Sequence, residues 1–456
     1  MDTPFATRWA GIGFALPVLF FLLVVMNAPP YVPLQDYNEW TYQGYIAAQL
    51  LQGHLTGQYA FTAFPVPNSA VQLILGVLNF AVPAPLASRL VASAYVIAAI
   101  VLAWRISLRI CPMENAGYFF LLLACLYFNT PFWNGYMNYQ MGILLFSAWL
   151  LLDPATRRKP QWVLLFSVAG FFVHAVIWAS ILLMIGIDVA RRRRIVAALP
   201  VLFSLGLFGW YAAARHTPVL PDPLEYAGLF KIAAYKLYTL AKLGPYHHFT
   251  YDDGIVSSYE RVGYYAGCAL NAVFALGIVY VLYVILYGTL RNGSWRRMSD
   301  ERIGACVLLA MFVALPPVIS DLVNPGERVL YPALLLALFG AGELEAAGGR
   351  RVHTAAPFVN FLVFEPGMRA VVRALAASGV VAVLCAIGLV ANSERLIHKP
   401  TTNVDGGTPA LRYFQTRPAA YDDVRARLDG ALPLRPLGFE TGFLLNVGSP
   451  LGHSDH

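Results

Sequence analysis

The feature that most limits the fold of this chain is a series of long apolar runs that recur along most of its length. A helix of about 20 mainly apolar residues crosses the hydrocarbon core of a bilayer, and several of the runs approach that length. Charged residues make up only 12% of the chain and hydrophobic residues 58%, whereas a soluble domain carries about 25% charged residues. We therefore expect an all-α integral membrane protein.

About eleven transmembrane helices are expected. They are placed near residues 9–28, 87–108, 117–132, 138–153, 161–173, 174–190, 195–214, 262–289, 303–320, 329–346 and 371–393. The stretch 161–190 fits either one long tilted helix or two shorter ones. The first run is interpreted as a retained helix and not as a signal peptide, because Arg8 precedes it and no convincing small-residue cleavage site is present.

Basic residues cluster in short loops between the apolar runs, which indicates the cytoplasmic side of a membrane. With a cytoplasmic N-terminus, every cluster falls on that side. The clusters are Arg105 with Arg109, residues 157–159, residues 191–194, Arg291 with Arg296, Arg297 and Arg302, and Arg350 with Arg351. The net charge of +7 is thus a topology signal, and no nucleic-acid partner is expected.

The predicted organisation is one polytopic transmembrane domain, residues 1–395, and a small soluble tail, residues 396–456. Two long loops, 29–86 and 215–261, face outward together with the tail. In the first loop, residues 38–52 and about 68–80 are expected to form short amphipathic helices that lie along the membrane surface. The five cysteines show neither CxxC nor Cys/His spacing, so no disulfide framework or zinc site is predicted.

Two acidic residues, Asp36 and Glu39, stand just beyond the first apolar run. Ionised groups at the membrane rim need water, a partner or a function, so this pair is a candidate for catalysis. Asp36 also precedes the helix expected at 38–52, where the backbone N–H groups and the helix dipole favour an anion. The alternatives are a helix cap or an ion pair for Asp36 and a solvated helix face for Glu39.

The order of elements in the first loop resembles that of the GT-C superfamily of membrane glycosyltransferases, which use polyprenyl-phosphate sugars. The shared features are a spanning helix, an acidic loop, two surface helices around the Pro-rich turn 64–67, and Arg89-Leu90 at the next span. Residues 325–334, Pro-Gly-Glu-Arg-Val-Leu-Tyr-Pro-Ala-Leu, are similar to a stretch that opens a late span in such enzymes. The Asp-Tyr-Asn at 36–38 and the pair Asn138-Tyr139 look closest to bacterial members of no assigned function.

The resemblance implies an inverting transfer of a hexosyl or pentosyl group from a polyprenyl phosphate to a hydroxyl acceptor, on a lipid or a glycan. The reaction would take place on the outer face of a bacterial inner membrane, with the tail in the periplasm. Asp36 matches the general base, with Glu39 as a second acid. The chain departs from many members in having Gln35 before Asp36 instead of adjacent acidic residues. Arg328 and Arg89 match cations that would hold the phosphate, because guanidinium groups bind phosphate oxygens in pairs.

Several further residues are candidates for ligand binding. Lys242 and His247 end a stretch in which lysines alternate with tyrosines, which suits either a lipid phosphate or a membrane-surface anchor. His247 and His248 beside Asp252 and Asp253 could hold a divalent ion, but adjacent histidines rarely chelate one ion together, so no cofactor is expected. The substrate candidates are Asn134, Tyr136, Asn138 and His174. Helix anchoring, and for His174 a hydrogen bond between helices, are the competing interpretations.

A transporter or lipid flippase is the alternative function. It would need polar groups at mid-membrane depth and broken helices in paired positions. His174 and the break at Pro316-Pro317 hint at this, but the chain has no internal repeat of fixed period. A third alternative is a structural subunit without chemistry, in which Asp36 would have no task.

Overall fold

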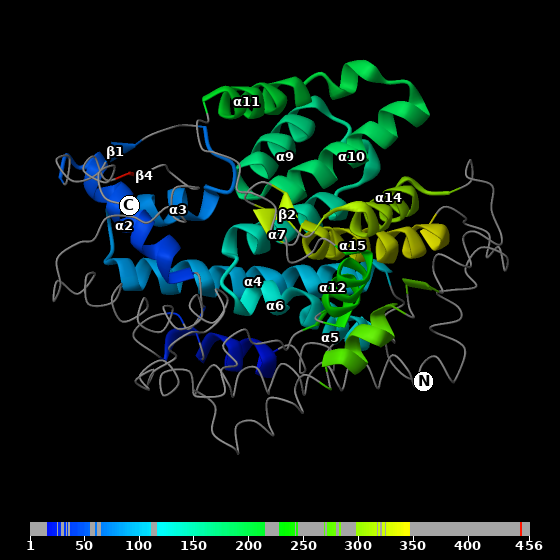
Figure 1. Cartoon of the computed structure of the whole chain (residues 1–456), viewed down its shortest axis with the longest axis horizontal. Helices are drawn as coiled ribbons and strands as arrows, with labels where there is room; N and C mark the ends of the chain where they lie inside the picture. Colours follow the sequence, from blue (N-terminus) through cyan, green and yellow to red (C-terminus); the bar gives the residue numbers. More distant parts are fainter. Residues whose placement is uncertain are drawn as a thin grey trace.

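The described part of the computed structural model is built almost entirely from helices (Figure 1). The structure describes residues 16–24, 26–28, 32, 34, 37–54, 60–61, 65–110, 116–214, 228–241, 243–244, 269, 271–279, 282–283, 298–316, 318–319, 322–323, 325–346 and 447–448. Two pairs of two-residue antiparallel strands accompany the helices. They are β1 (Ala60–Phe61) with β4 (Val447–Gly448), and β2 (Val318–Ile319) with β3 (Leu322–Val323). The predicted all-α class is confirmed for this part of the chain.

Many of the helices overlap apolar runs that were expected to span a membrane, and those at residues 37–51, 70–78, 154–157 and 229–241 lie between the runs. In order they are α2 (Tyr37–Leu51), α3 (Ala70–Leu78), α4 (Ala84–Ile110), α5 (Ala116–Tyr127), α6 (Thr130–Trp133), α7 (Met137–Leu151), α8 (Pro154–Arg157), α9 (Pro160–Val173), α10 (Ala175–Arg192), the 3₁₀ turn η1 (Ile195–Ala198), α11 (Val201–Ala214), α12 (Leu229–Ala241), α14 (Asp300–Ala314) and α15 (Pro325–Ala346). Among the described residues, α4 is the one helix long and apolar enough to cross a bilayer by length and composition, and the apolar helices α9 and α11 are shorter. The span expected at 371–393 lies outside the described residues.

The stretch 161–190 forms two helices that meet at His174. This residue has an extended backbone, with φ −169° and ψ 133°, so it ends α9 and caps the first turn of α10. At the other end of the pair, Arg158 before α9 forms an ion pair of 2.9 Å with Asp188 of α10. Because the far ends touch and the near ends share one residue, α9 and α10 form an antiparallel hairpin with His174 at its tip.

The two helices expected in the first loop are present as α2 and α3. Gly53, with φ +81°, follows α2 at the expected stop, because glycine adopts this left-handed conformation without strain. The two helices pack so closely that a Cβ on Gly44 would lie 2.6 Å from Cβ of Leu75. Helix α14 ends earlier than the span expected at 303–320, since Leu315 is extended before Pro316.

Basic residues from several loops gather at one end of the bundle, here called the basic end. Arg109 at the end of α4 lies 3.7 Å from Asp153, and Arg191 at the end of α10 lies 2.5 Å from Asp300. Arg302 at the start of α14 donates to the carbonyl oxygen of Gly340, late in α15. Helices α2 and α3 lie at the opposite end of α4 (Figure 1). The chain therefore separates these arginines from the segment that carries α2 and α3.

The basic end contains a buried ion pair whose loss is expected to be costly. Arg157 and Glu301 are 3.1 Å apart, with side chains only 7% and 6% exposed. Arg157→Met should lower the free energy of unfolding by about 3–5 kcal/mol, because the carboxylate of Glu301 remains buried without its counter-charge. Thermal unfolding of the purified protein in detergent measures this effect.

Two controls identify the cause of that loss. Arg109→Met removes an exposed pair, with side chains 36% and 76% exposed, and should cost no more than about 1 kcal/mol. The double variant Arg157→Met with Glu301→Leu should recover much of the loss, because no unpaired charge remains buried. Equal effects of Arg157→Met and Arg109→Met would contradict the prediction.

Candidate functional site

Arg328, in the first turn of α15, meets residues from two distant parts of the chain. Its Nη1 lies 3.2 Å from Nε2 of His174, at the tip of the α9–α10 hairpin. Its Cζ lies 5.1 Å from the centre of the Tyr136 ring, just before α7, which is within the range of a cation–π contact. Three of the residues chosen from sequence thus lie together, and we call Arg328, His174 and Tyr136 the Arg328 cluster.

Tyr139 fixes the geometry of this cluster from the side of α7. Its hydroxyl donates a hydrogen bond of 2.7 Å to the carbonyl oxygen of Arg328. Its ring packs edge-on against the imidazole of His174, with 4.9 Å between the ring centres. Tyr139 is buried, so the main chain of Arg328 and the ring of His174 share one rigid support.

The imidazole of His174 faces two hydrogen-bond donors. Its Nδ1 lies 3.2 Å from the backbone N–H of Val176, and its Nε2 lies 3.2 Å from the guanidinium of Arg328. A neutral imidazole has one acceptor nitrogen, and a guanidinium can only donate. The ring can therefore accept from one of these donors at a time. When Nδ1 caps α10, Nε2 carries the proton and faces the guanidinium as a second donor, and two donors at this distance would both be satisfied by an acceptor such as a phosphate oxygen.

Asn138 is a structural link beside the cluster. Its Oδ1 accepts from the backbone N–H of Val71, and its Nδ2 donates to the carbonyl oxygen of Asn68. The side chain of Asn68 in turn accepts from the backbone N–H of Ala175, next to His174. Asn68 has φ +60°, a conformation that asparagine tolerates better than most residues. These bonds hold the starts of α3, α7 and α10 together, so Asn138 positions the hairpin tip.

The turn before α7 joins the cluster to the start of α2. Asn129 caps α6 by accepting from Phe132, and the buried Asn134 ends α6 two residues before Tyr136. The indole N–H of Trp40, in the first turn of α2, donates a hydrogen bond of 3.2 Å to the carbonyl oxygen of Gly135. The start of α2 therefore lies beside the turn that carries Tyr136.

The start of α2 also contacts the start of α4, where Arg89 lies. The hydroxyl of Tyr37 donates to the carbonyl oxygen of Ser88, at 2.9 Å, and Thr41 donates to the hydroxyl of the same serine. Arg89 follows Ser88 directly, so its backbone is held at the first turn of α2. The described contacts connect Arg89 to α2 and Tyr136 to α2, but they give no direct contact between Arg89 and Arg328.

Some of the residues chosen from sequence are not described. Asp36, Lys242 and His247 lie outside the described residues. Glu39 contributes its backbone to the first turn of α2, and its side chain is also outside the described part. Within the described ranges, no group of three or more His, Cys, Asp or Glu residues could hold a metal ion.

Lys236 of α12 has a role that the sequence did not indicate. Its ammonium group donates to the carbonyl oxygens of Phe312 and Leu315, the second at 2.6 Å, and so caps the end of α14. Burial lowers the pKa of this amine. Gly326 lies at the start of α15, two residues before Arg328. A Cβ on Gly326 would lie 2.9 Å from Nζ of Lys236, so the lysine stands beside the start of this helix. Lys236 thus joins the end of α14 to the start of α15.

A buried polar network behind the site was also missed by sequence reasoning. Tyr95 of α4 donates to Gln140 of α7, and Gln140 donates to Asn129, at 2.7 and 2.6 Å. Tyr127 donates to Ser147 within the same region. Gln140 lies two positions after Asn138 on α7, so polar residues spaced along this apolar helix were the available signal. The network ties the turn 129–136 to the helices that support it.

No family model, curated protein or solved structure matches this chain.

Proposed function

We propose that this chain is an integral membrane glycosyltransferase that moves a sugar from a polyprenyl phosphate to a hydroxyl acceptor. The observation that carries the proposal is the meeting of Arg328, His174 and Tyr136 beside the start of α2. These groups come from distant segments of the chain, and His174 and Arg328 alone are 154 positions apart. The likeness of residues 29–90 and 325–334 to the GT-C superfamily supports the same reading.

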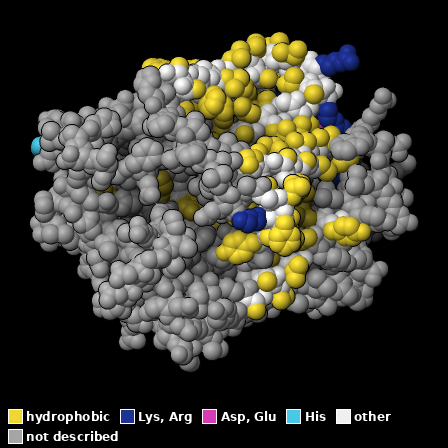
Figure 2. All heavy atoms as spheres, in the orientation of Figure 1, with side chains coloured by type: hydrophobic (Ala, Val, Ile, Leu, Met, Phe, Trp, Pro, Cys, Tyr) yellow, Lys and Arg dark blue, Asp and Glu magenta, His cyan; other side chains and the backbone are white. Residues whose placement is uncertain are grey.

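The surface of the described helices supports placement in a membrane. Figure 2 shows hydrophobic side chains over most of the described part of one face, with Lys and Arg mainly at its right-hand edge. Large exposed apolar residues recur on several helices, including Leu90, Ile97 and Val101 of α4, Leu164 and Leu165 of α9, and Leu202, Phe203, Leu205, Phe208 and Trp210 of α11. Soluble monomers rarely expose continuous apolar surface of this extent, so contact with lipid tails is the natural environment for it.

The arginine distribution gives this arrangement an orientation. With the basic end in the cytoplasm, as the positive-inside rule favours, the Arg328 cluster and α2 face the outer side. The pairing of Ala60–Phe61 with Val447–Gly448 joins the tail to the first loop, which agrees with a tail on that same side. The proposed location is a bacterial inner membrane with about eleven spans, and α2 and α3 lying at the outer surface.

In the proposed reaction, Asp36 acts on the acceptor and Arg328 acts on the leaving phosphate, on opposite sides of the anomeric carbon. Asp36 takes the proton from the acceptor hydroxyl. At the same time the oxygen of that hydroxyl bonds to the anomeric carbon of the sugar, with inversion. The bond from that carbon to the phosphate oxygen breaks, and the polyprenyl phosphate leaves with the electron pair. Negative charge grows on this phosphate, where the guanidinium of Arg328 and the N–H of His174 stabilise it. Arg89 and Glu39 are the second cation and second acid, and the reaction requires no cofactor.

Tyr136, Asn134 and Asn138 are assigned to the acceptor or sugar side of the site. The Tyr136 ring already lies against Arg328, so a sugar bound beside the phosphate would meet its edge. Asn138 and the buried Asn134 hold the turn and the hairpin tip in place. Lys242 and His247, which follow α12, would meet the lipid phosphate at the membrane surface.

Transport is the weaker alternative. A transporter would bind its substrate at mid-membrane depth between the halves of broken helices. His174 instead lies at the tip of an antiparallel hairpin, at the opposite end from the ion pair of Arg158 and Asp188. The polar cluster therefore stands at an end of the bundle, which is the position that chemistry at the outer surface requires.

The proposal is tested with the full-length protein reconstituted in liposomes. Polyprenyl phosphates that carry labelled hexoses and pentoses are supplied with envelope lipid and glycan acceptors, and the labelled products are identified by mass spectrometry. Transfer of label to an acceptor, together with loss of one envelope sugar in a deletion strain, is the expected result. Movement of the intact donor across the liposome membrane without transfer would instead establish transport.

A further inference from the structure

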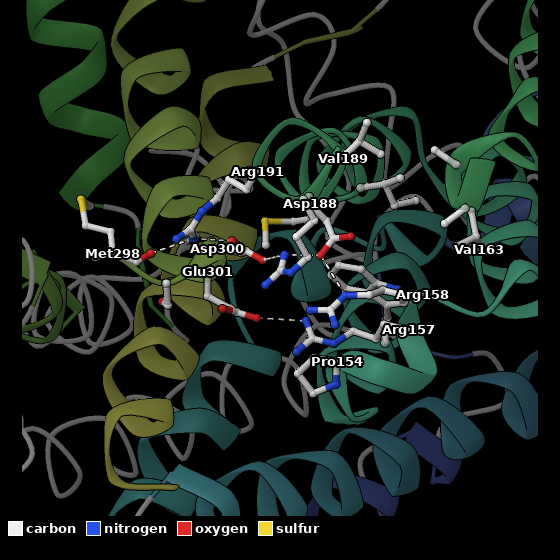
Figure 3. Close-up of a pocket in the computed structure, with 17 residues that line it drawn as sticks. Pro154, Arg157, Arg158, Val163, Asp188, Val189, Arg191, Met298, Asp300 and Glu301 are labelled. Atoms are coloured by element: carbon white, nitrogen blue, oxygen red, sulfur yellow. Dashed lines mark hydrogen bonds and ion pairs between the residues drawn. The ribbon is translucent and has the colours of Figure 1, made fainter. Parts of the chain in front are cut away.

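A cavity lies at the basic end, away from the Arg328 cluster (Figure 3). Its volume is about 240 Å³. It is bounded by α8, the end of α10, the turn η1 and the start of α14, and Trp149 of α7 closes one side. The residues that matter here are its arginines, its carboxylates and two small residues of η1.

The cavity lining carries more positive than negative charge. Its arginines are Arg157, Arg158, Arg191 and Arg192, and its carboxylates are Asp188, Asp300 and Glu301. Four positive groups thus face three negative ones. The exposed Arg193 and Arg194 follow Arg192 in the chain, between the cavity residues of α10 and those of η1.

Ion pairs with the carboxylates hold the guanidinium groups in place. Arg158 lies 2.9 Å from Asp188, while Arg191 and Arg192 lie 2.5 and 2.6 Å from the two oxygens of Asp300. Arg192 pairs with Asp188 as well, and Arg191 also donates to the carbonyl oxygen of Met298. A guanidinium has five N–H donors in a fixed plane, so these contacts do not exhaust its capacity for oxygen ligands. Arginines fixed in this way are arranged in advance for a further anion, and phosphate is the anion that matches their geometry.

An apolar surface begins directly at the rim of this charged cavity. Ala197 and Ala198 line the cavity, and their neighbours Ile195 and Val196 are 67% and 77% exposed. The exposed side chains of Leu199, Leu202 and Phe203 continue this surface onto α11. A ligand that fits both parts must carry an anionic head beside an apolar tail.

We propose that this cavity binds the phosphate headgroup of an anionic phospholipid, whose acyl chains lie along η1 and the start of α11. The inference rests on the membrane placement and orientation proposed above and goes beyond the glycosyl transfer, because it concerns the opposite end of the bundle. Basic pockets between helices on the cytoplasmic side are suited to anionic lipids, which are concentrated in that leaflet. A soluble phosphate would use the arginines but leave the apolar rim without a partner.

The test measures lipid retention by the full-length protein in detergent, using native mass spectrometry during titration with phosphatidylglycerol or phosphatidylcholine. The protein should bind phosphatidylglycerol at least tenfold more tightly than phosphatidylcholine. The double variant Arg191→Gln with Arg192→Gln should remove most of this preference. Arg105→Gln, an exposed arginine on α4 that does not line the cavity, should leave the preference unchanged.

A second variant guards against a loss of fold, since Arg191 and Arg192 also make ion pairs. Ile195→Asp with Val196→Asp leaves all four lining arginines in place, and should weaken phosphatidylglycerol binding by a similar factor. Glycerol 1-phosphate is the soluble probe, and it should not compete at concentrations where the lipid binds. Equal affinity for the two lipids, full retention by the η1 variant, or efficient competition by glycerol 1-phosphate would each overturn the proposal.

The outcome is separate from that of the proposed function. Sugar transfer is measured at the Arg328 cluster with labelled donor, and lipid retention is measured without donor. Normal retention with no transfer would refute the glycosyltransferase alone, and normal transfer with no lipid preference would refute the lipid site alone.

Discussion

Arg328→Ala is expected to lower the rate of sugar transfer by about 10²–10³-fold, measured with labelled donor in liposomes. The guanidinium lies at the point where His174, Tyr136 and α15 meet, and the leaving phosphate gains negative charge as the sugar departs. A donor fixed in advance at such a position stabilises the transition state more than the bound substrate. The loss should therefore appear mainly in kcat, with a smaller rise in KM.

Two matched variants separate this role from a structural one. Arg328→Lys keeps the charge but loses the paired donors, so it should retain part of the activity. Arg105→Ala removes an exposed arginine near the basic end and should transfer sugar at the normal rate. Tyr139 bonds to the backbone carbonyl oxygen of residue 328, so the alanine variant keeps this contact and is expected to fold. Thermal unfolding checks the fold. Unchanged transfer by a folded Arg328→Ala protein would exclude the guanidinium from the reaction.

Asp36→Asn is expected to reduce transfer by about 10²–10⁴-fold, the usual contribution of a general base. The amide is close in size to the carboxylate but cannot take the proton of the acceptor hydroxyl. Asp36 directly precedes Tyr37, whose hydroxyl is held by Ser88, and Trp40 of the same helical turn binds the turn that carries Tyr136. The chain therefore brings the first turn of α2 to the Arg328 cluster.

The competing role for Asp36, a cap on α2, predicts a different result. Asparagine caps helices about as well as aspartate, so a capping residue would tolerate Asp36→Asn with little change in stability or transfer. As a base, Asp36 must be ionised, so the rate of the unmodified protein should fall as the pH drops and the carboxylate is protonated. This acidic limb should be absent from the residual rate of Asp36→Asn. Asp153→Asn, at an exposed carboxylate of the basic end, serves as the control.

Apolar length and loop charge were enough to anticipate much of the helical framework. The runs around α4, α7, α10 and α15 were visible because apolar helices of this kind depend on the recurrence of apolar residues, which is a local property. The apolar length of residues 161–190 fitted either one long helix or two shorter ones. The choice depended on His174, where the chain is extended: its neighbour Ala175 bonds Asn68 and its ring meets Arg328 of α15, and composition registers neither contact.

The contacts of the site depended on residues distant in the chain. His174 was chosen for the cost of placing a polar group among apolar residues, and Arg328 for its place in a stretch that resembles GT-C enzymes, but nothing local indicated that they touch. Lys236 belongs to the stretch of alternating lysines and tyrosines that suited a lipid phosphate or a membrane-surface anchor. Its observed partners were not foreseen because they are backbone carbonyl oxygens of the end of α14, which every helix end offers. Asn68 was hidden for a related reason, since its left-handed backbone and its bonds to Asn138 and Ala175 exist only once three helices have assembled.

The α9–α10 hairpin has one further consequence. His174 lies at its tip. At the other end, Arg158 forms an ion pair with Asp188, and Arg192 forms one with Asp300. A lipid bound at Arg158 and Arg192 and a sugar donor bound at His174 would contact opposite ends of the same two helices, α9 and α10. If the lipid changes the affinity for the donor by some factor, the donor must change the affinity for the lipid by the same factor, because linkage between two binding equilibria is reciprocal.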